Sequence, residues 1–211
     1  MTSKIITFSG VDGAGKSTII EYVAKELQSS GFRVIKKRSR PQILPILSSF
    51  KHGKQNAEDI ATEALPRLGK NRSKLTSFLR FIYYFVDYII GQVLIGIKHK
   101  GKKDIILYDR YYFDFIVDPI RANIYLPKPI TKFFYKFIFK PDMNIFLFAS
   151  PEEISRRKKE LDKNTIINLT QEYKELFNDF GKHDSEKYLI IENMSLEKCS
   201  SVIINHIYKI L

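Results

Sequence analysis

A glycine-rich stretch at residues 10–17 decides the fold: Gly10-Val11-Asp12-Gly13-Ala14-Gly15-Lys16-Ser17. It matches the pattern G-x-x-x-x-G-K-[ST] in full, in which glycines let the backbone curl around phosphate oxygens. Residues 4–9 before it are β-branched and aromatic and predict a buried strand, whereas residues 16–29 after it carry apolar side chains at helical spacing. A strand, a glycine loop and a helix in this order predict a phosphate-binding loop.

Individual positions of the loop have their own chemistry. Lys16 can bridge the β- and γ-phosphates of ATP, the Ser17 hydroxyl can ligate Mg²⁺, and Thr18 can reach the α-phosphate. Asp12 is an anion beside the expected phosphate, so it either faces an acceptor, where it would orient a hydroxyl or accept a proton, or stabilises a turn ahead of Gly13. The loop residues expected to hold ATP are Gly10, Asp12, Gly13, Ala14, Gly15, Lys16, Ser17 and Thr18.

Short apolar runs alternate with helical patterns along the rest of the chain. Further strands are predicted at residues 32–35, 104–108, 143–149 and 188–191, and further helices at residues 73–98, within 112–139, from 151, at 166–180 and at 196–211. Residues 41–72, which prolines and glycines interrupt, predict short helices and a mobile loop. The alternation predicts an α/β fold with a parallel sheet that binds ligands at the carboxyl ends of its strands.

Polar residues follow two of the other predicted strands. Asp109 ends the third strand, where a carboxylate can hold Mg²⁺, and Arg110 beside it can bind phosphate oxygens in a bidentate way. The alternative is a local structural ion pair. Arg38 and Arg40 lie in a basic loop, residues 36–41, after the second strand; they either bind an acceptor phosphate or are surface charges.

A basic cluster follows the fourth strand. Ser150-Pro151-Glu152-Glu153 begins a helix with an N-cap serine and a capping box, and the helix is expected to carry the basic residues Arg156, Arg157, Lys158 and Lys159. Four successive positions cannot face one site. The glycine loop lacks an arginine, so one or two of the four are candidates to stabilise a phosphoryl group in transfer; the alternative is a solvated basic face.

Residues 81–97 are almost all apolar, over 17 positions that include Asp87 and Gln92. A membrane-spanning helix needs about 20 apolar residues, so the segment is interpreted as a core or dimer-interface helix and no membrane span is expected. An aspartate in an apolar helix needs a partner or a ligand, which makes Asp87 an acceptor-site candidate. Tyr84, one turn away, is interpreted as a core residue.

Length and charge restrict the class of protein. A chain of 211 residues suits one domain, and the single cysteine, Cys199, excludes a disulfide or a thiolate metal site within the chain. The first strand begins at Lys4, which leaves no room for a signal peptide, so a cytoplasmic location is expected. The net charge of +12 suits anionic partners, but the lysines are scattered and no nucleic-acid motif accompanies them. No binding to DNA is expected.

These motifs together resemble the thymidylate kinase family. The resemblance rests on residues 8–18, on Tyr108-Asp109-Arg110-Tyr111, on the helix start at residues 150–153 and on Ile190-Ile191-Glu192-Asn193, in order and over nearly the whole chain. It implies a three-layer α/β/α P-loop NTPase fold, with a five-stranded parallel sheet in the order 2-3-1-4-5. It also implies a single kinase domain over residues 1–211 with a helical lid at about 151–166, the cofactors ATP and Mg²⁺, and a homodimer.

The reaction that this resemblance implies is transfer of a phosphoryl group from ATP to dTMP. It implies that Lys16 and Ser17 hold ATP and the metal ion, and that Asn193 lies near the adenine. The expected catalytic residues are Asp12, Lys16, Asp109, Arg110, Arg156 and Arg157, and the expected metal ligands are Ser17 and Asp109. The expected substrate-binding residues are Arg38, Arg40, Asp87, Arg110, Tyr111 and Asp114.

The acceptor side departs from the family pattern. Asp114 stands near the place of a serine, and Pro119 near that of a glutamine. The family carries an arginine for the acceptor phosphate on the long helix, whereas that neighbourhood here holds Phe85 and Asp87, and the nearest arginine is Arg80. A carboxylate there would repel a phosphate. Three hypotheses follow: a nucleoside monophosphate kinase, most simply for dTMP; a P-loop kinase for a sugar, a lipid-linked group or a nucleoside; and a nucleotide-dependent switch or ATPase.

Overall fold

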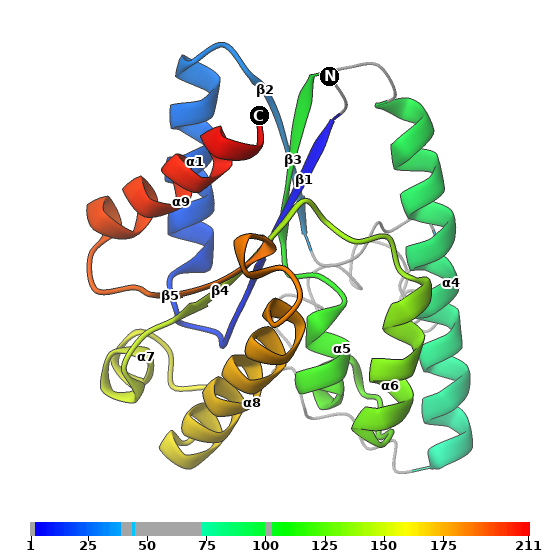
Figure 1. Ribbon diagram of the computed structural model, residues 1–211. Helices are drawn as coiled ribbons and strands as arrows, with labels where there is room; N and C mark the ends of the chain where they lie inside the picture. Colours follow the sequence, from blue (N-terminus) through cyan, green and yellow to red (C-terminus); the bar gives the residue numbers. More distant parts are fainter. Residues whose placement is uncertain (1–2, 39–43, 45–72, 100–102) are drawn as a thin grey trace, which may run out of the picture. The chain divides into compact units, whose positions relative to one another are not determined.

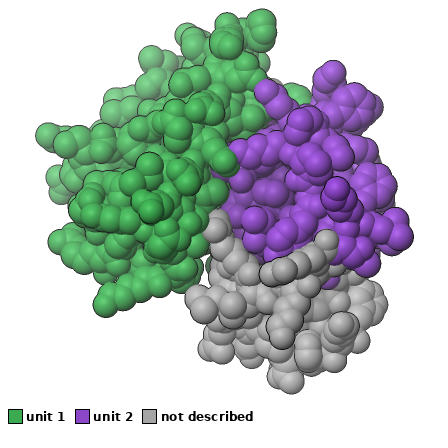
Figure 2. Space-filling model, turned by 90° about the horizontal axis from the view of Figure 1, so that it is seen from below, with its two compact units in different colours: residues 1–39, 98–113, 140–211 green, residues 40–97, 114–139 purple. Residues whose placement is uncertain are grey.

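The computed structural model describes residues 3–38, 44, 73–99 and 103–211. The chain divides into two compact units, which Figure 2 distinguishes by colour. Unit 1 comprises residues 1–39, 98–113 and 140–211, and unit 2 comprises residues 40–97 and 114–139. The prediction of short helices and a loop at residues 41–72 lies outside the described residues, apart from Leu44.

Unit 1 is built on a parallel sheet, whose five described strands lie in the order β2-β3-β1-β4-β5 (Figure 1). The strands are β1 (Lys4–Ser9), β2 (Arg33–Arg38), β3 (Asp104–Asp109), β4 (Met143–Phe148) and β5 (Tyr188–Glu192). Asp109 at the end of β3 is in register with Phe8 on one side and Arg38 on the other. The order inferred from the resemblance is confirmed, and the polar residues that end these strands share one edge of the sheet.

Helices cover both faces of this sheet. α1 (Lys16–Ser29) and α9 (Leu196–Ile210) pack against each other on one face, and α8 (Lys163–Gly181) lies on the other (Figure 1). Because successive strand residues point to opposite faces, Ile145 and Leu147 belong to the aliphatic core with α1 and α9. Phe146 between them stacks on Tyr173 of α8, with ring centroids 5.0 Å apart. The predicted three-layer arrangement is therefore present in unit 1.

Side-chain caps determine where the helices of unit 1 begin. Ser150 caps α7 (Pro151–Arg157), and its hydroxyl accepts a hydrogen bond from the Glu153 amide at 3.3 Å. Asp162 caps α8 in the same way through the Thr165 amide at 2.9 Å, and Ser195 caps α9. A cap of this kind stabilises a helix by about 1 kcal/mol. The short 3₁₀ turn η3 (Ser185–Lys187) leads into β5.

The described part of unit 2 is helical and aromatic. Its elements are α4 (Lys74–Lys98), α5 (Phe113–Val117), η1 (Pro119–Ala122), α6 (Lys128–Phe134) and η2 (Tyr135–Phe137); Lys98 and Phe113 themselves belong to unit 1. Phe134 of α6 packs edge-to-face on Phe81 and Phe85 of α4, with centroids 5.1 and 5.0 Å apart. Phe115 of α5 packs on Tyr88 of α4 at 5.7 Å. Ring contacts therefore join the three helices.

The long helix α4 has two unlike faces. Its buried residues recur at helical spacing: Ser77, Phe81, Tyr84, Asp87, Tyr88, Gly91, Gln92 and Ile95. Apolar residues on the opposite face are exposed, among them Leu79 (60 %) and Ile97 (67 %). Asp87 is fully buried and accepts a hydrogen bond from the Leu44 amide at 2.6 Å, so a backbone group is one partner of this carboxylate.

By length and hydropathy, α4 is also the one described helix that is long and apolar enough to cross a membrane. It has 25 residues, so the argument that the apolar segment is too short is wrong for the helix as a whole. The core helix of a soluble protein meets the same criteria, and one such helix is weak support for a span. The buried carboxylate of Asp87 counts against a span, because a charge inside a bilayer is costly.

Two of the element boundaries that differ from the sequence prediction change the place of basic residues. β2 continues through residues 36–38, which pair with β3, so these residues belong to the strand and not to the predicted basic loop. β2 is an edge strand, where charged side chains reach solvent without disturbing the backbone pairing. α7 ends at Arg157; Lys158 has an extended backbone, and Lys158 and Lys159 follow the helix instead of lying on it.

Candidate active site

The glycine loop joins β1 to α1 in unit 1. Gly10, Gly13 and Gly15 have φ angles of +146°, +89° and +90°, which L-residues rarely adopt. A Cβ atom on Gly10 would collide with the Leu147 carbonyl oxygen, and one on Gly15 would collide with the side-chain nitrogen of Asn193. Glycine is therefore required at these two positions both for the backbone conformation and for the close approach of a neighbour.

Lys16 is the first residue of α1, and its side chain turns back over the loop. Its ammonium donates hydrogen bonds to the carbonyl oxygens of Gly10 and Val11, both at 2.9 Å, and the residue is 5 % exposed. Ser17 and Thr18 follow in the first turn of the helix and are exposed. A helix N-terminus with amide hydrogens and an ammonium group favours an anion. The loop therefore provides the donors that a nucleotide phosphate needs.

Ser17 and Asp109 supply oxygen atoms beside the loop. The Ser17 hydroxyl donates to Oδ2 of Asp109 at 3.3 Å, while Oδ1 of Asp109 is buried and makes no hydrogen bond. A hydroxyl and an unsatisfied carboxylate oxygen fit Mg²⁺, which prefers oxygen ligands and takes the remaining ones from water and substrate phosphates. Among the described residues there is no group of three His, Cys, Asp or Glu side chains that could hold a metal ion alone.

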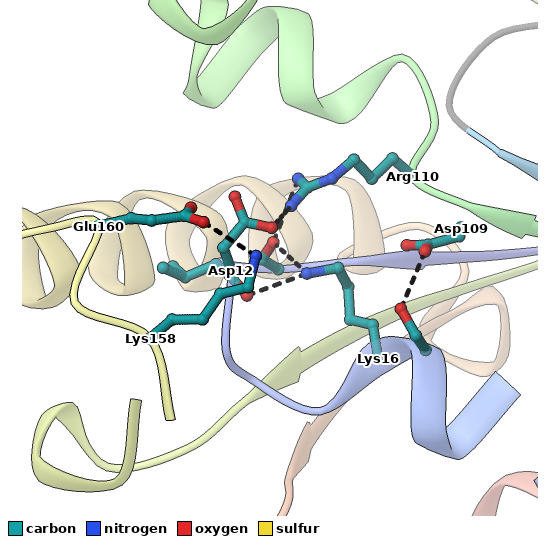
Figure 3. Close-up of polar contacts among 9 residues, drawn as sticks. Asp12, Lys16, Asp109, Arg110, Lys158 and Glu160 are labelled. Carbon is teal, nitrogen blue, oxygen red and sulfur yellow. Dashed lines mark hydrogen bonds and ion pairs between the residues drawn. The ribbon is translucent and has the colours of Figure 1, made fainter. Parts of the chain in front are cut away.

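Arg110 and Asp12 form an ion pair across the loop (Figure 3). Nη2 of Arg110 lies 2.5 Å from Oδ1 of Asp12, and Nη1 donates to the Gly10 carbonyl at 3.3 Å. Both side chains are largely buried, at 10 % and 15 % exposure. The guanidinium neutralises an anion that would otherwise repel phosphate. Arg110 therefore takes part in an ion pair, but its partner is the distant Asp12 and not the neighbouring Asp109.

Arg110 also has an unusual backbone. Its φ is +78°, although it is not a glycine, and its amide donates to the Phe8 carbonyl at 2.8 Å. This bond continues the β1–β3 pairing by one residue and turns the side chain toward the glycine loop. In the view of Figure 3, the Lys16 ammonium lies between the Asp12 and Asp109 side chains.

Of the two candidate arginines on α7, one reaches the loop. Nη1 of Arg157 donates to the Gly13 carbonyl at 3.4 Å, and Glu153 one turn earlier holds its other nitrogen at 3.7 Å. Arg156 is 76 % exposed, with Glu153 at 4.0 Å. Lys158 pairs with Glu160 at 3.0 Å near the same loop (Figure 3). The structure therefore brings Arg157, and not Arg156, to the phosphate-binding loop.

Asn193 follows β5 and holds the glycine loop from the other side. Its side-chain amide donates to the Ala14 carbonyl at 2.9 Å, and its backbone amide donates to the Phe148 carbonyl at 2.7 Å. The residue is 8 % exposed. A buried amide with satisfied hydrogen bonds fixes a loop more firmly than an exposed one. The contact that the structure gives Asn193 is thus with the loop backbone.

Those of the other predicted substrate-binding residues that the structure describes divide between the two units. Arg38 is exposed at the end of β2, beside Asp109 in the sheet register, and Arg40 is outside the described residues. Tyr111 is buried, with its ring 5.5 Å from that of Tyr108. Asp87 and Asp114 belong to unit 2. Of this set, Arg38 and Arg110 alone lie at the sheet edge that carries the glycine loop, within the described part of unit 1.

Three features of the site escaped the sequence reading. The partner of Arg110 is 98 residues away, and the Ala14 carbonyl lies 179 residues from Asn193, so no local pattern indicates either contact. The third is the selection of Arg157 over Arg156, which spacing does not decide, because Glu152 stands four residues before Arg156 just as Glu153 stands four residues before Arg157.

Comparison with known proteins agrees with this geometry. The family model described as thymidylate kinase matches residues 8–203, which include the glycine loop, Asp109-Arg110 and Asn193. A search among curated proteins finds no matching relative. The match covers most of the chain, and the residues that it spans build a phosphate-binding loop on a parallel sheet of the expected order. The chain therefore belongs to the thymidylate kinase family and is a kinase of the kind that phosphorylates nucleoside monophosphates with ATP.

Proposed function

We propose that the protein transfers the γ-phosphoryl group of ATP to dTMP and releases dTDP and ADP. The family match over residues 8–203 supports this choice of acceptor. The observation that carries the phosphoryl-transfer chemistry is the set of groups around the glycine loop: the buried Lys16 ammonium, the Ser17–Asp109 pair and the Arg110 guanidinium. Positioning and charge neutralisation provide most of the catalysis of such a transfer.

ATP binding in this proposal exchanges one set of hydrogen bonds for another. The Lys16 ammonium leaves the carbonyl oxygens of Gly10 and Val11 and takes the β- and γ-phosphate oxygens instead. Ser17 and Asp109 would hold Mg²⁺, which would neutralise charge on the bridging phosphates. We also propose that Asn193 keeps the loop in shape through the Ala14 carbonyl, in place of the adenine contact implied by the resemblance.

Two basic groups are proposed to act on the phosphoryl group in transfer. Arg157 already touches the Gly13 carbonyl, so a small side-chain movement brings its guanidinium to the γ-phosphate. We assign residues 151–166, which include α7, to a lid, and Arg157 to its catalytic arginine. Arg110 is proposed to bind the acceptor phosphate, which then competes with Asp12 for the guanidinium. Asp12 released in this way can accept a hydrogen bond from an acceptor hydroxyl.

We further propose that the protein acts in the cytoplasm as one kinase domain and as a homodimer. The exposed apolar face of α4 supports the dimer: Leu75, Leu79, Val86, Ile90, Val93 and Ile97 recur at helical spacing on it. Such a stripe on a 25-residue helix fits the same helix of a second copy.

The decisive experiment measures ADP production from Mg-ATP with dTMP, with each other nucleoside monophosphate, with thymidine and without an acceptor, alongside direct measurement of ATP binding. Turnover that rises with dTMP above all other acceptors is the expected result. If ATP binds and no nucleoside monophosphate raises turnover, the proposed acceptor is wrong.

A second candidate acceptor lacks a phosphate, as a nucleoside or a sugar does. Asp87 favours it, because a carboxylate in the neighbourhood where the family carries a phosphate-binding arginine repels phosphate and accepts hydrogen bonds from hydroxyl groups. Turnover stimulated by thymidine and not by dTMP would select this candidate.

A further inference from the structure

The segment from Pro119 to Pro141 contains no acidic residue, although both of its neighbours, Asp118 and Asp142, are aspartates. Lysines recur within it at every fourth position: Lys128, Lys132, Lys136 and Lys140. The first three lie on α6 and η2 in unit 2 and are exposed. The segment therefore concentrates positive charge on one short stretch of surface.

Three phenylalanines lie among these lysines with their rings in solvent. Phe133, Phe137 and Phe139 are 52 %, 56 % and 53 % exposed. Exposure of three such rings to water within seven residues is unfavourable for a soluble protein unless another surface covers them. We name Lys128, Lys132, Phe133, Lys136, Phe137 and Phe139 the α6 surface.

The opposite side of the same segment is anchored within unit 2. Phe134 packs on Phe81 and Phe85 of α4, and Tyr135 and Ile138 are buried. The Phe139 amide donates to the Gln92 side chain of α4 at 3.0 Å. The exposed rings therefore stand on a backbone that tertiary contacts hold in place, at the position of α6 in Figure 1.

Charge and rings are combined rather than segregated on this surface. The Lys136 ammonium lies 5.3 Å from the centroid of the Phe133 ring. Basic groups around projecting aromatic rings suit the interface of an anionic bilayer, where the rings enter the headgroup region and the ammonium groups meet lipid phosphates. We propose that the α6 surface docks the protein on a membrane that carries anionic lipids.

Charge complementarity favours an anionic membrane over a second copy of the chain as the partner of the α6 surface. A two-fold contact through the α6 surface would bring its lysines against the same lysines of the partner, and like charges in a desolvated contact are unfavourable. A bilayer of anionic lipids offers the opposite charge and an apolar interior at once. The net charge of +12 adds long-range attraction to the same kind of surface.

The test is flotation of the full-length protein with vesicles of phosphatidylcholine that contain about one third phosphatidylserine, compared with pure phosphatidylcholine. Three variants are compared with the wild type: Lys132→Gln/Lys136→Gln, Lys132→Arg/Lys136→Arg, and Phe133→Ser/Phe137→Ser/Phe139→Ser. Matched controls remove the same groups from exposed positions of unit 1: Lys25→Gln/Lys209→Gln and Ile167→Ser/Val202→Ser. Circular dichroism and thermal melting establish that each variant is folded.

We expect binding to the anionic vesicles and little to the neutral ones. Each lysine removed from the α6 surface should weaken binding by about fivefold, the arginine pair should restore it, and added salt should weaken it. The folded serine triple should lose binding, while both control variants should keep it. If the triple fails to fold, the glutamine pair and its arginine rescue still decide the test.

Three results would overturn the proposal. One is absence of vesicle binding by the wild type. Another is binding that the Lys132→Gln/Lys136→Gln variant and the folded serine triple leave unchanged. The third is binding of single-stranded DNA, but not vesicles, through the same lysines, which would make the surface a nucleic-acid site.

Discussion

The two units of the chain expose very different surfaces. Unit 1 contains most of the described residues, yet of the eighteen exposed large hydrophobic side chains among the described residues, twelve belong to unit 2: eight on α4 and four at residues 120–139. Unit 1 instead gathers polar and charged groups at the carboxyl edge of its sheet. The candidate phosphate-binding groups of the glycine loop and most of the exposed apolar side chains therefore lie on separate segments of the chain.

The units also differ in how their interiors are built. Unit 1 encloses an aliphatic core between the sheet and the helices α1 and α9, and the backbone of every strand pairs with a neighbour. The described part of unit 2 depends on ring contacts, such as those of Phe134 and Phe115 with α4. Substitutions in the two units should therefore change different observables, and the following predictions test that separation from the largest effect to the smallest.

Lys16→Ala should abolish the reaction and leave the fold intact. The substitution removes the ammonium expected to meet the β- and γ-phosphates, which should lower kcat roughly 10²–10³-fold. Lys25→Ala, on the exposed side of the same helix, is the control. ADP production measures the effect, and circular dichroism checks the fold. Normal turnover by the Lys16→Ala variant would mean that the glycine loop does not take part in catalysis.

Leu79→Glu combined with Val86→Glu should dissociate the proposed dimer without changing ATP binding. Two carboxylates on the apolar stripe of α4 would be buried without partners at a dimer contact, which should weaken self-association by at least about a hundredfold. Sedimentation velocity measures the association. The control is Ile167→Glu combined with Val202→Glu on exposed positions of unit 1. If the Leu79→Glu/Val86→Glu variant associates as strongly as the wild type, the dimer interface does not include this face of α4.

Asn193→Ala should raise the KM for ATP by about tenfold while kcat changes less, because the lost hydrogen bond positions the Ala14 carbonyl and touches no phosphate. Asn205→Ala, at an exposed position of α9, is the control.

The same contact can be tested against Gly15. Gly15→Ala alone should lower the melting temperature, and Asn193→Ala should rescue part of that loss, since it removes the atom that the new Cβ meets. The remaining loss reflects the φ of +90°. If the two substitutions change the melting temperature additively, the side chains at positions 15 and 193 do not touch.

The ionisation of Cys199 should have the smallest effect on stability, and the reactivity of its thiol should show how tightly the core of unit 1 is closed. Burial raises the pKa of the Cys199 thiol from 9.0 to about 11, so thiol reagents should react slowly with the folded protein at pH 8. Because the folded pKa is the higher one, this thiol stabilises the fold fully below pH 9 and less as the pH rises toward 11. Denaturant titrations at several pH values check the trend, which Cys199→Ala should reduce. Rapid labelling of the native protein would mean that this core opens readily.

Much of unit 1 could be predicted from the sequence because its signals are local. The helix at residues 16–29 was predicted with its observed bounds, since its apolar spacing and its glycine neighbours lie within the helix and the turns beside it. The strand order came from the resemblance and not from any local pattern, because pairing partners lie up to 137 residues apart.

Other parts could not be read for physical reasons. The charges of Lys36, Lys37 and Arg38 indicated a loop, but edge strands tolerate exposed charge, so pairing with β3 prevailed. The apolar pattern of α4 predicted a helix and left open which face is buried, which depends on Phe115 and Phe134 from distant segments. The exposure of the rings of Phe133, Phe137 and Phe139 was not predicted, because the sequence indicated only a helical, aromatic segment at residues 112–139.

The left-handed backbone at Arg110 has a consequence for how this kinase can be varied. A non-glycine residue with a φ of +78° costs about 1 kcal/mol or more, and glycine would adopt it without that cost. At position 110, thermal stability and turnover therefore favour different residues. Arg110→Gly should relax the chain and leave Asp12 without its cation. In a library of variants at position 110, selection for heat resistance alone should enrich glycine. Selection for product formation should enrich arginine.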